Sequence, residues 1–493
     1  MTKKVVIIGG GIAGLSAGIY ALRSGFDVTI LEGHSKAGGN CTSWRRGGYL
    51  FEGGMHWLTG SNPNEPLNKL WRTVGALDDQ VVIHYPEPYF TLDYQGMPIS
   101  LFRNVDKTEH HLIAISPEDE KVIRELCKSV RKVQGLTLPV IDLKGVRTTN
   151  KQSMPLSMIF TGISMLSLMN SLSKTPQSEY INRFKHAGIR DLLYSNSNAE
   201  SGMLPLIFTL GVLTRGDGGF PEGGSLPFVE RIVNTYLAGG GELLLRSRAD
   251  QVIIENNQAV GVSFGDRQLP CDAVIVTADT MAVNSLFEQP LQADWLDTMQ
   301  NSTKPTMVTL VSLGVNADLS QYPRGYVFKP QNPIRLADQE YQCLSVNNYS
   351  GDQFYSPPGK TALTIHLGGD TYDFWKQAKQ NGSYLEAKEK IAAAVIQALA
   401  TQIPEVDGKV EVIDVATPLT YERYLGNWRG SWMTEMTSGM KMQNYPAVIE
   451  GLAGLYFAGQ RMQPPGGLPV ALLSGRTAVQ YLCRDTDTMF VSD

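Results

Sequence analysis

Charge is scarce in this sequence. Asp, Glu, Lys and Arg together make up 18% of its 493 residues, and the formal net charge is -5. Proteins that bind nucleic acid carry clustered positive charge, so this composition argues against nucleic acid as the main partner. Hydrophobic residues account for 42% of the chain. That fraction is typical of a globular protein, and the length suffices for about two or three domains.

Cysteine is also rare, and its five residues are scattered along the chain. Cys41, Cys127, Cys271, Cys343 and Cys483 form no CxxC pair and have no metal-ligand spacing, so the sequence predicts no metal site. Such a set suits a reducing cytosol. The N-terminus leads directly into a strand-like run, which leaves no room for a signal or transit peptide. We therefore expect a cytoplasmic protein, and membrane association is left open as an alternative.

Familiar catalytic groupings of side chains are missing as well. We find no nucleophile triad, no paired carboxylates at a defensible spacing and no cluster of metal ligands in the sequence. Chemistry on this chain would therefore depend on a bound cofactor. The protein would supply orientation and a dry cavity.

The N-terminal stretch carries the strongest pattern that is present. A β-branched run at 5–8 leads at once into a glycine-rich turn at 9–14, a helix-like segment follows at 15–23, and a second apolar run at 28–31 ends at Glu32. This order of strand, tight turn, helix, strand and acid is the dinucleotide-binding fingerprint.

Each residue type in the turn has a physical role. Gly9 permits the tight exit from the strand, Gly11 lets the backbone approach a pyrophosphate, and Gly14 permits close packing of helix and sheet. The helix N-terminus at Ala13 then offers free N–H groups to the phosphates. The carboxylate of Glu32 can accept hydrogen bonds from both ribose hydroxyls, and it would repel a 2′-phosphate. The pattern predicts FAD or NAD and excludes NADP.

A second glycine pair favours FAD over NAD. The run Gly38-Gly39-Asn40-Cys41-Thr42 follows Leu31-Glu32. It resembles the glutathione-reductase-like two-domain flavoproteins, in which a Gly-Gly-Arg-x-x-Ser/Thr element wraps the FAD pyrophosphate. The chain departs from that pattern at Asn40, which can donate a hydrogen bond but brings no charge.

The same resemblance extends to the middle and end of the chain. A valine in the second strand of the mid-chain return meets the adenine through its backbone in those flavoproteins, and Val252 occupies that position; Ala278 follows the last of these strands. Near the C-terminus, a strand leads to Gly459, and Gly466, Gly467 and Leu468 open a helix that runs to about 483. We expect the N-terminus of this helix to point at the flavin pyrimidine and to stabilise negative charge at N1 and O2.

A glycine-flanked aromatic run lies at 47–60, where Gly54, Met55, His56 and Trp57 are adjacent. Glycines beside an aromatic strand suggest backbone passing close to a flat ligand. His56, Trp57 and Arg461 are the candidates for residues near the reacting ring. A functional role for His56 is possible because the pKa of histidine is near neutral. A purely structural, hydrogen-bonded His56 is the alternative interpretation. Tyr421, Tyr424 and Trp432 are either cavity-lining or core residues.

The chain as a whole resembles the superfamily of phytoene desaturases, carotenoid isomerases and retinol saturases. The runs that carry this resemblance are 9–14, 38–39, 51–57, 223–224 and 459–475. It implies an FAD enzyme acting on a long apolar polyene, carotenoid, retinoid or isoprenoid, as a desaturase, saturase or isomerase. Hydride would move between a C–C bond and flavin N5. No second GxGxxG module is visible, so the electron acceptor is unassigned.

Two rival functions stay open at this point. One is a flavin amine oxidase of the same fold. The other is a flavin-free prenyl-binding module like a Rab GDP-dissociation inhibitor, which has no need of a helix dipole aimed at flavin N1.

The fold that these patterns predict is α/β: a glutathione-reductase-like, two-domain FAD-binding Rossmann fold with a mixed-sheet substrate domain and a helical cap. We expect residues 1–77, 215–290 and 416–493 to form the FAD-binding part, and residues 78–214 and 291–415 to form the substrate part. Residues 154–172 are apolar and uncharged. They are interpreted as a buried cap helix, a helix docked on a membrane surface, or a membrane span.

Overall fold

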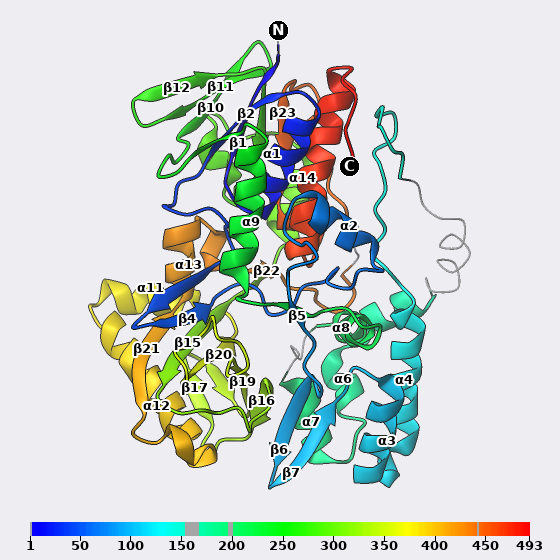
Figure 1. Cartoon of the computed structure of the whole chain (residues 1–493), viewed down its shortest axis with the longest axis vertical. Helices are drawn as coiled ribbons and strands as arrows, with labels where there is room; N and C mark the ends of the chain where they lie inside the picture. Colours follow the sequence, from blue (N-terminus) through cyan, green and yellow to red (C-terminus); the bar gives the residue numbers. More distant parts are fainter. Residues whose placement is uncertain (1, 153–166, 196–200, 441–442) are drawn as a thin grey trace.

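The computed structural model describes residues 2–152, 167–195, 201–440 and 443–493. One half of the molecule, at the top of Figure 1 with both chain ends, is built on a five-stranded parallel sheet. The strand order is β23-β13-β1-β2-β9. These strands are β1 (Lys4–Ile8), β2 (Asp27–Leu31), β9 (Glu242–Leu244), β13 (Ala273–Val276) and β23 (Leu455–Phe457). Three distant stretches of sequence therefore build one sheet.

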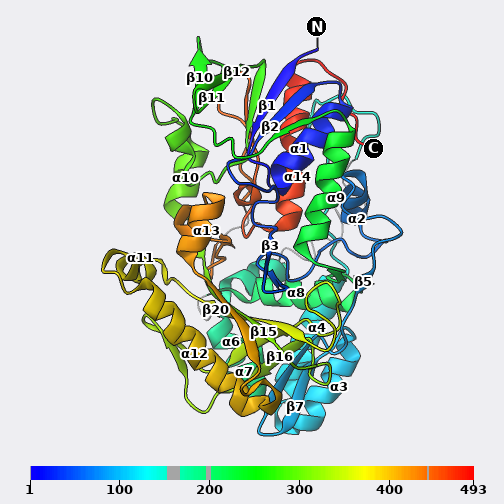
Figure 2. The ribbon, with the colours of Figure 1, turned by 60° about the vertical axis from the view of Figure 1, so that its left-hand side comes forward.

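Both faces of this sheet are covered, which is why its strands are apolar throughout. Val5 and Ile7 of β1 pack in one core with the helices α1 (Ile12–Arg23), α9 (Ser225–Ala238) and α14 (Leu468–Asp485). Val6 and Ile8, which point the other way, pack against a three-stranded antiparallel sheet. That sheet consists of β10 (Gln251–Glu255), β11 (Gln258–Phe264) and β12 (Arg267–Pro270). Figure 2 shows the three helices and the small sheet on opposite sides of β1 and β2.

The other half of the molecule contains a seven-stranded mixed sheet with the order β21-β15-β20-β19-β16-β6-β7. Its strands are β6 (Phe90–Tyr94), β7 (Met97–Leu101), β15 (Val308–Val315), β16 (Gly325–Phe328), β19 (Leu344–Asn348), β20 (Thr361–Gly368) and β21 (Val410–Ala416). The pairing of β16 with β6 is parallel, and the other pairings are antiparallel.

Helices cover this second sheet in two groups. A core shared with β15, β19 and β20 includes residues of α11 (Tyr372–Gln380) and α12 (Tyr384–Gln402). The core around β6 and β7 is shared with α3 (Val105–Ile115), α4 (Glu120–Gln134), α6 (Gln177–Ile181), α7 (Ala187–Tyr194) and α8 (Met203–Thr214). The second group forms the helical layer at the lower right of Figure 1.

Shorter helices and strand pairs complete the fold. They include α2 (Pro66–Thr73), α10 (Asp294–Ser302), α13 (Pro418–Leu425) and the strand pairs β3 (Ser43–Arg46) with β4 (Tyr49–Glu52), β5 (Ile83–His84) with β8 (Phe220–Pro221), β14 (Pro305–Thr306) with β22 (Met433–Thr434), and β17 (Ile334–Leu336) with β18 (Gln339–Tyr341). The parallel sheet draws on all three segments predicted for the FAD-binding part, and the mixed sheet draws mainly on the two predicted for the substrate part. The domain boundaries themselves stay a prediction.

Most of the apolar segment 154–172 lies outside the described residues, so its three interpretations stay open. Within the part that is described, residues 167–174 are helical and Leu172 is buried. Across the described ranges, no helix combines the length and apolar character that crossing a membrane requires.

Candidate active site

A large cavity with a volume of about 2260 Å³ lies at the carboxyl ends of β1 and β2 and extends to α8 and the mixed sheet. It contains most of the residues that the sequence predicted for a cofactor or a reacting ring. These are Gly9, Gly11, Ala13, Glu32, Gly38, Gly39, Asn40, Gly54, Met55, His56, Trp57, Ala278, Gly459, Arg461, Gly466, Gly467 and Leu468. Three other predicted cofactor residues, Gly14, Thr42 and Val252, are not among the described residues that line the cavity.

The backbone at the end of β1 forms a narrow cradle with the second glycine pair. Gly38 N–H donates to Gly10 O at 2.8 Å. Gly38 and Gly39 have positive φ values of 124° and 56°, which L side chains rarely adopt. A Cβ at Gly39 would lie 3.2 Å from Gly11 Cα. Side chains are therefore kept out of a groove that a flat or phosphorylated ligand can approach closely.

The start of α1 points into this cradle. Its N-cap is Gly11, and no side chain of the described chain caps it, so the first N–H groups of the helix are available to an anion. Gly14 lies where helix α1 approaches the sheet closely, as the sequence predicted, since an added Cβ would lie 3.1 Å from Thr277 Oγ1, just after β13. A Cβ at this position would lie 1.9 Å from Gly9 O, so glycine allows the helix to begin directly at the end of β1.

Glu32 is held at the end of β2 by the backbone. Its carboxylate accepts hydrogen bonds from Gly10 N and His34 N, both at 2.7 Å. A carboxylate has about four acceptor positions, so capacity is left for a ribose. Val252 is not among the described lining residues, and its side chain packs in the core between the sheets, so its predicted backbone contact with the adenine stays a prediction. Arg248 and Ala249, which precede β10, line the cavity at this end instead.

The side-chain amide of Asn40 makes hydrogen bonds to other residues of the protein. It donates to Trp432 O at 3.2 Å and accepts from the side chain of Asn427 at 2.5 Å. Asn40 therefore positions the 427–432 loop at the cavity. These hydrogen bonds use the same side-chain amide that the predicted phosphate contact would have needed. Thr42 pairs through its carbonyl with Gly53 N at 3.0 Å, behind the cavity wall.

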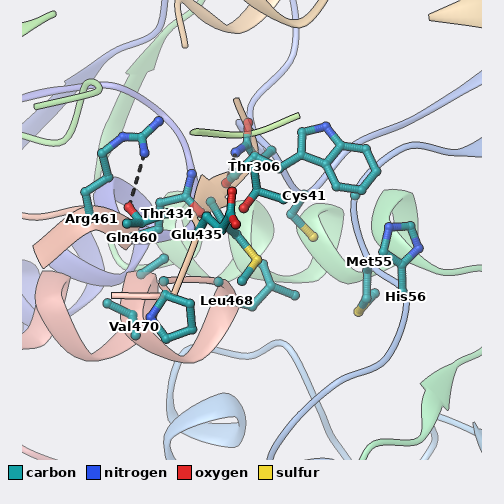
Figure 3. A pocket seen from close by; sticks show the side chains of 18 of the residues that line it. Cys41, Met55, His56, Thr306, Thr434, Glu435, Gln460, Arg461, Leu468 and Val470 are labelled. Carbon is teal, nitrogen blue, oxygen red and sulfur yellow. Dashed lines mark hydrogen bonds between the residues drawn. The ribbon is translucent and has the colours of Figure 1, made fainter. Parts of the chain in front are cut away.

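A second helix N-terminus opens into the same cavity. Gly467 is the N-cap of α14, again without a side-chain cap in the described structure, and α14 packs along α1. Leu468 and Val470 at its start line the cavity, and Figure 3 shows them on the side opposite Met55 and His56. Two positive helix ends therefore face one space, a geometry that favours negative charge there.

Three rings form a cluster beside Met55. The ring centroid of His56 lies 4.3 Å from that of His366 and 5.2 Å from that of Trp432. Burial, and secondarily the charge of Arg324, lowers the pKa of His56 to about 4. Neither ring nitrogen of His56 has a hydrogen-bond partner among the described residues. His56 is therefore neutral at pH 7, contrary to the near-neutral basicity expected from the sequence.

Arg461 is engaged in a buried ion pair. Its Nε donates to Asp279 Oδ1 at 2.6 Å and its Nη2 to Asp279 Oδ2 at 2.9 Å, with side chains 3% and 6% exposed. The same guanidinium donates to Ser431 Oγ and to Thr434 Oγ1, and Figure 3 shows Arg461 beside Thr434. Asp279 also accepts from Trp428 N. This pair ties the end of β13 to the 428–434 loop, so the structure gives Arg461 a positioning role.

Glu52 was missed by the sequence analysis. It is fully buried, and it accepts hydrogen bonds from Gly54 N and Met55 N at 2.9 Å and from Ser225 N, at the start of α9, at 2.8 Å. Burial raises its pKa. Glu52 thus fixes the loop that carries His56 against a helix N-terminus. The only signal for it in the sequence was a lone acid in an apolar, glycine-rich run.

The aromatic group predicted near the C-terminal motif divides between wall and core. Tyr424 and Trp432 line the cavity. Tyr421 is buried behind it, packs against Trp432 with ring centroids 5.4 Å apart, and donates to Gly53 O at 3.3 Å.

Comparison with known proteins identifies the family of this chain. A family model described as flavin-containing amine oxidoreductase matches residues 12–483. The chain belongs to this family. As a member of the flavin-containing amine oxidoreductases, it is 22% identical to all-trans-retinol 13,14-reductase of Danio rerio over 86% of this chain and 76% of that protein. It is 21% identical to phytoene desaturase (lycopene-forming) of Pseudescherichia vulneris over 98% and 99% of the two chains.

Solved structures of other proteins share the fold. An oxidoreductase from Methanosarcina mazei superposes with a TM-score of 0.61 and 18% identity, covering 97% of this chain and 100% of that one. Putrescine oxidase superposes with a TM-score of 0.61 and 14% identity, covering 98% and 99%. The predicted α/β FAD-binding fold is confirmed.

FAD is the cofactor of this flavin-containing amine oxidoreductase, as predicted. The residues present fit it, because a glycine cradle, two uncapped helix N-termini and the carboxylate of Glu32 line one cavity. The flavin-free prenyl-binding alternative is therefore set aside. The protein is an FAD-dependent oxidoreductase.

Proposed function

We propose that this oxidoreductase transfers hydride between a C–C bond of a long apolar polyene, carotenoid, retinoid or isoprenoid and flavin N5, as a desaturase, saturase or isomerase. The carrying observation is the continuity of the cavity. It runs from the glycine cradle to a chamber walled by α8 on one side and by β6 and the mixed sheet on the other.

The chamber supports an apolar substrate. Helix α8 presents Leu204, Leu206, Phe208, Leu210 and Leu213 to it, and Tyr89, Phe90 and Leu101 lie on the wall beside β6 and β7. Burying apolar surface is worth about 25 cal/mol per Å², so a long hydrocarbon chain would gain most of its affinity here. The names all-trans-retinol 13,14-reductase and phytoene desaturase (lycopene-forming) indicate that these two relatives act on retinol and phytoene.

The described side chains need to do little acid–base work. Bound FAD supplies the two-electron chemistry. The N-terminus of α14 stabilises negative charge near Gly467. Glu52 and Tyr421 hold the loop that carries His56, and the apolar chamber excludes water from the reacting bond. His56 contributes a neutral ring, since its pKa is lowered to about 4 by burial.

The amine-oxidase alternative is less well supported by this cavity. Arg324 lines it, and its Nε has no hydrogen-bond partner among the described residues. This guanidinium disfavours an ammonium group bound beside it, although carboxylates such as Asp191 and Glu340 line other parts of the cavity.

The test is anaerobic incubation of the FAD-loaded protein with phytoene, all-trans-retinol and putrescine while the visible flavin absorbance is followed. Loss of the oxidised spectrum with a more saturated donor indicates a desaturase, and recovery of dithionite-reduced protein with a polyene indicates a saturase. Conversion of a polyene isomer without net flavin turnover indicates an isomerase. Reduction by putrescine, with peroxide released in air, would overturn the proposal in favour of an amine oxidase.

A pair of variants tests whether the chamber holds the substrate. Leu210 lines it, so Leu210→Trp is expected to slow reaction with the long polyene while FAD content is kept. Leu237→Trp is the matched control, because Leu237 is 46% exposed on α9, outside the cavity. Equal rates in both variants would contradict the assignment of the chamber.

A further inference from the structure

One cation in the chamber wall is left without an opposite charge. Arg324 immediately precedes β16 and lines the cavity. Its Nε is buried and has no hydrogen-bond partner in the described part of the chain. No acidic side chain among the described residues lies within ion-pair distance of it. This sets it apart from Arg461, whose charge is neutralised by Asp279.

Aromatic rings hold the Arg324 guanidinium in place. Its Cζ lies 4.2 Å from the ring centroid of Phe220 and 4.6 Å from that of Tyr349. Cation–π contact offsets part of the cost of removing the charge from water, but leaves the Nε–H group without an acceptor among the described residues. The positive charge of Arg324 also acts on the cluster of His56, His366 and Trp432, since it contributes to the lowered pKa of His56.

Polar groups surround Arg324 on the same wall. Its carbonyl accepts a hydrogen bond from Asn348 N at 2.8 Å, and β16 pairs with β19 so that Gly325 lies opposite Asn347. Ser345 and Asn347 of β19 line the cavity together with Arg324. Helix α8, which forms another part of the wall, is mainly apolar there. The chamber therefore has a polar side with one unneutralised cation and a hydrocarbon side.

We infer that Arg324 binds the anionic head group, a carboxylate or a phosphate, of an amphiphilic substrate whose apolar chain lies along α8. This inference rests on the proposed function and narrows its substrate class from hydrocarbons to polyene or isoprenoid acids and phosphates. A planar guanidinium can donate two parallel hydrogen bonds to either anion. Anchoring one end of the substrate also sets which C–C bond reaches the flavin.

The experiment compares retinoids that share one polyene and differ in the head group. FAD-loaded protein is titrated with all-trans-retinoic acid, retinyl phosphate and all-trans-retinol, and binding is followed by the change in the flavin absorbance spectrum. The native protein should bind at least one anionic retinoid about tenfold or more tightly than the alcohol. A preference for the acid or for the phosphate identifies the anion.

Variants separate recognition from packing. Arg324→Gln should abolish the preference for the anion while leaving affinity for retinol within about twofold, and Arg324→Lys should retain part of it. Arg267→Gln is the matched control, because Arg267 also lies over an aromatic ring, that of Phe264, but on the exposed strand β12. It should behave as the native protein does.

Three results would overturn the inference. The first is equal affinity of the native protein for acid, phosphate and alcohol, a comparison that needs no variant to fold. The second is an unchanged preference in Arg324→Gln. The third is an altered flavin midpoint potential in that variant with unchanged head-group preference, which would assign Arg324 to the cofactor. Failure of every retinoid and phytoene to bind would instead count against the proposed function itself, and the inference would fall with it.

Discussion

The buried pair of Arg461 and Asp279 offers the sharpest test of how the cavity is held together. Replacing Arg461 with Met removes the cation and leaves Asp279, whose side chain is 6% exposed, as an unpaired buried charge. Breaking a buried pair in this way costs about 3–5 kcal/mol. At an unfolding entropy of about 2.1 cal/mol/K per residue, the midpoint of a chain of this size should fall by about 3–5 °C if it unfolds as one unit.

The double variant Arg461→Met with Asp279→Asn decides between positioning and direct chemistry. It removes both charges, and Asn still accepts from the backbone N–H of Trp428, so most of the stability should return. If Arg461 only positions the 428–434 loop, FAD content and flavin reduction should return as well. A double variant that regains stability and FAD but stays unreactive would show that Arg461 acts on the reacting atoms.

Thermal unfolding followed by flavin fluorescence measures the stability and the FAD content of one sample. The control is Arg72→Met, which breaks the ion pair with Asp79. The side chains of Arg72 and Asp79 are 38% and 88% exposed. An exposed pair is worth about 0–1 kcal/mol. If Arg461→Met shifted the midpoint no more than Arg72→Met does, the reasoning from burial would be refuted.

Further predictions concern the cofactor site. Glu32→Ala removes the carboxylate that faces the ribose position and should weaken FAD binding roughly tenfold or more, measured by reconstituting apoprotein; unchanged affinity would count against this role. Gly14→Ala places a Cβ 1.9 Å from Gly9 O and should prevent recovery of FAD-loaded protein, whereas Gly135→Ala, with nothing within 4 Å of the added Cβ, should not. His56 has its pKa lowered from 6.5 to about 4, so its neutral form favours the fold and that stability is lost as pH falls below about 6.5, by up to about 1.4 kcal/mol per pH unit. Native protein should therefore lose thermal stability between pH 6.5 and 4.5 more steeply than His56→Gln, and parallel curves would contradict the burial argument.

The parts of the site that were predictable from the sequence are local ones. A strand, a glycine turn, a helix and a terminal acid are contiguous, and each imposes a residue type on its own position. The cradle at 9–14, the pair Gly38-Gly39 and the start of α14 could therefore be found in advance, and the structure brings them to one cavity.

The parts that could not be predicted depend on partners far away in the sequence. Asp279 and Arg461 are 182 residues apart, and Glu52 and Ser225 are 173 apart. Neither pairing leaves a periodic signal. Asn40 stands at a position where a phosphate contact was expected, and only the fold reveals that its amide is used by Asn427 and Trp432. In the sequence, nothing distinguishes Arg324 from an arginine on the surface, because its burial and its contacts depend on the fold.

The order of strands in the parallel sheet has a consequence for biosynthesis. Strand β23 pairs with β13, and α14 lies against α1, so one edge of the sheet and the second helix end are translated long after the glycine cradle with which they share the cavity. A nascent chain that has emerged only as far as residue 450 lacks both of them. The coenzyme site is therefore incomplete until residues beyond α14 have emerged, and nascent chains stalled near residue 450 should not retain FAD.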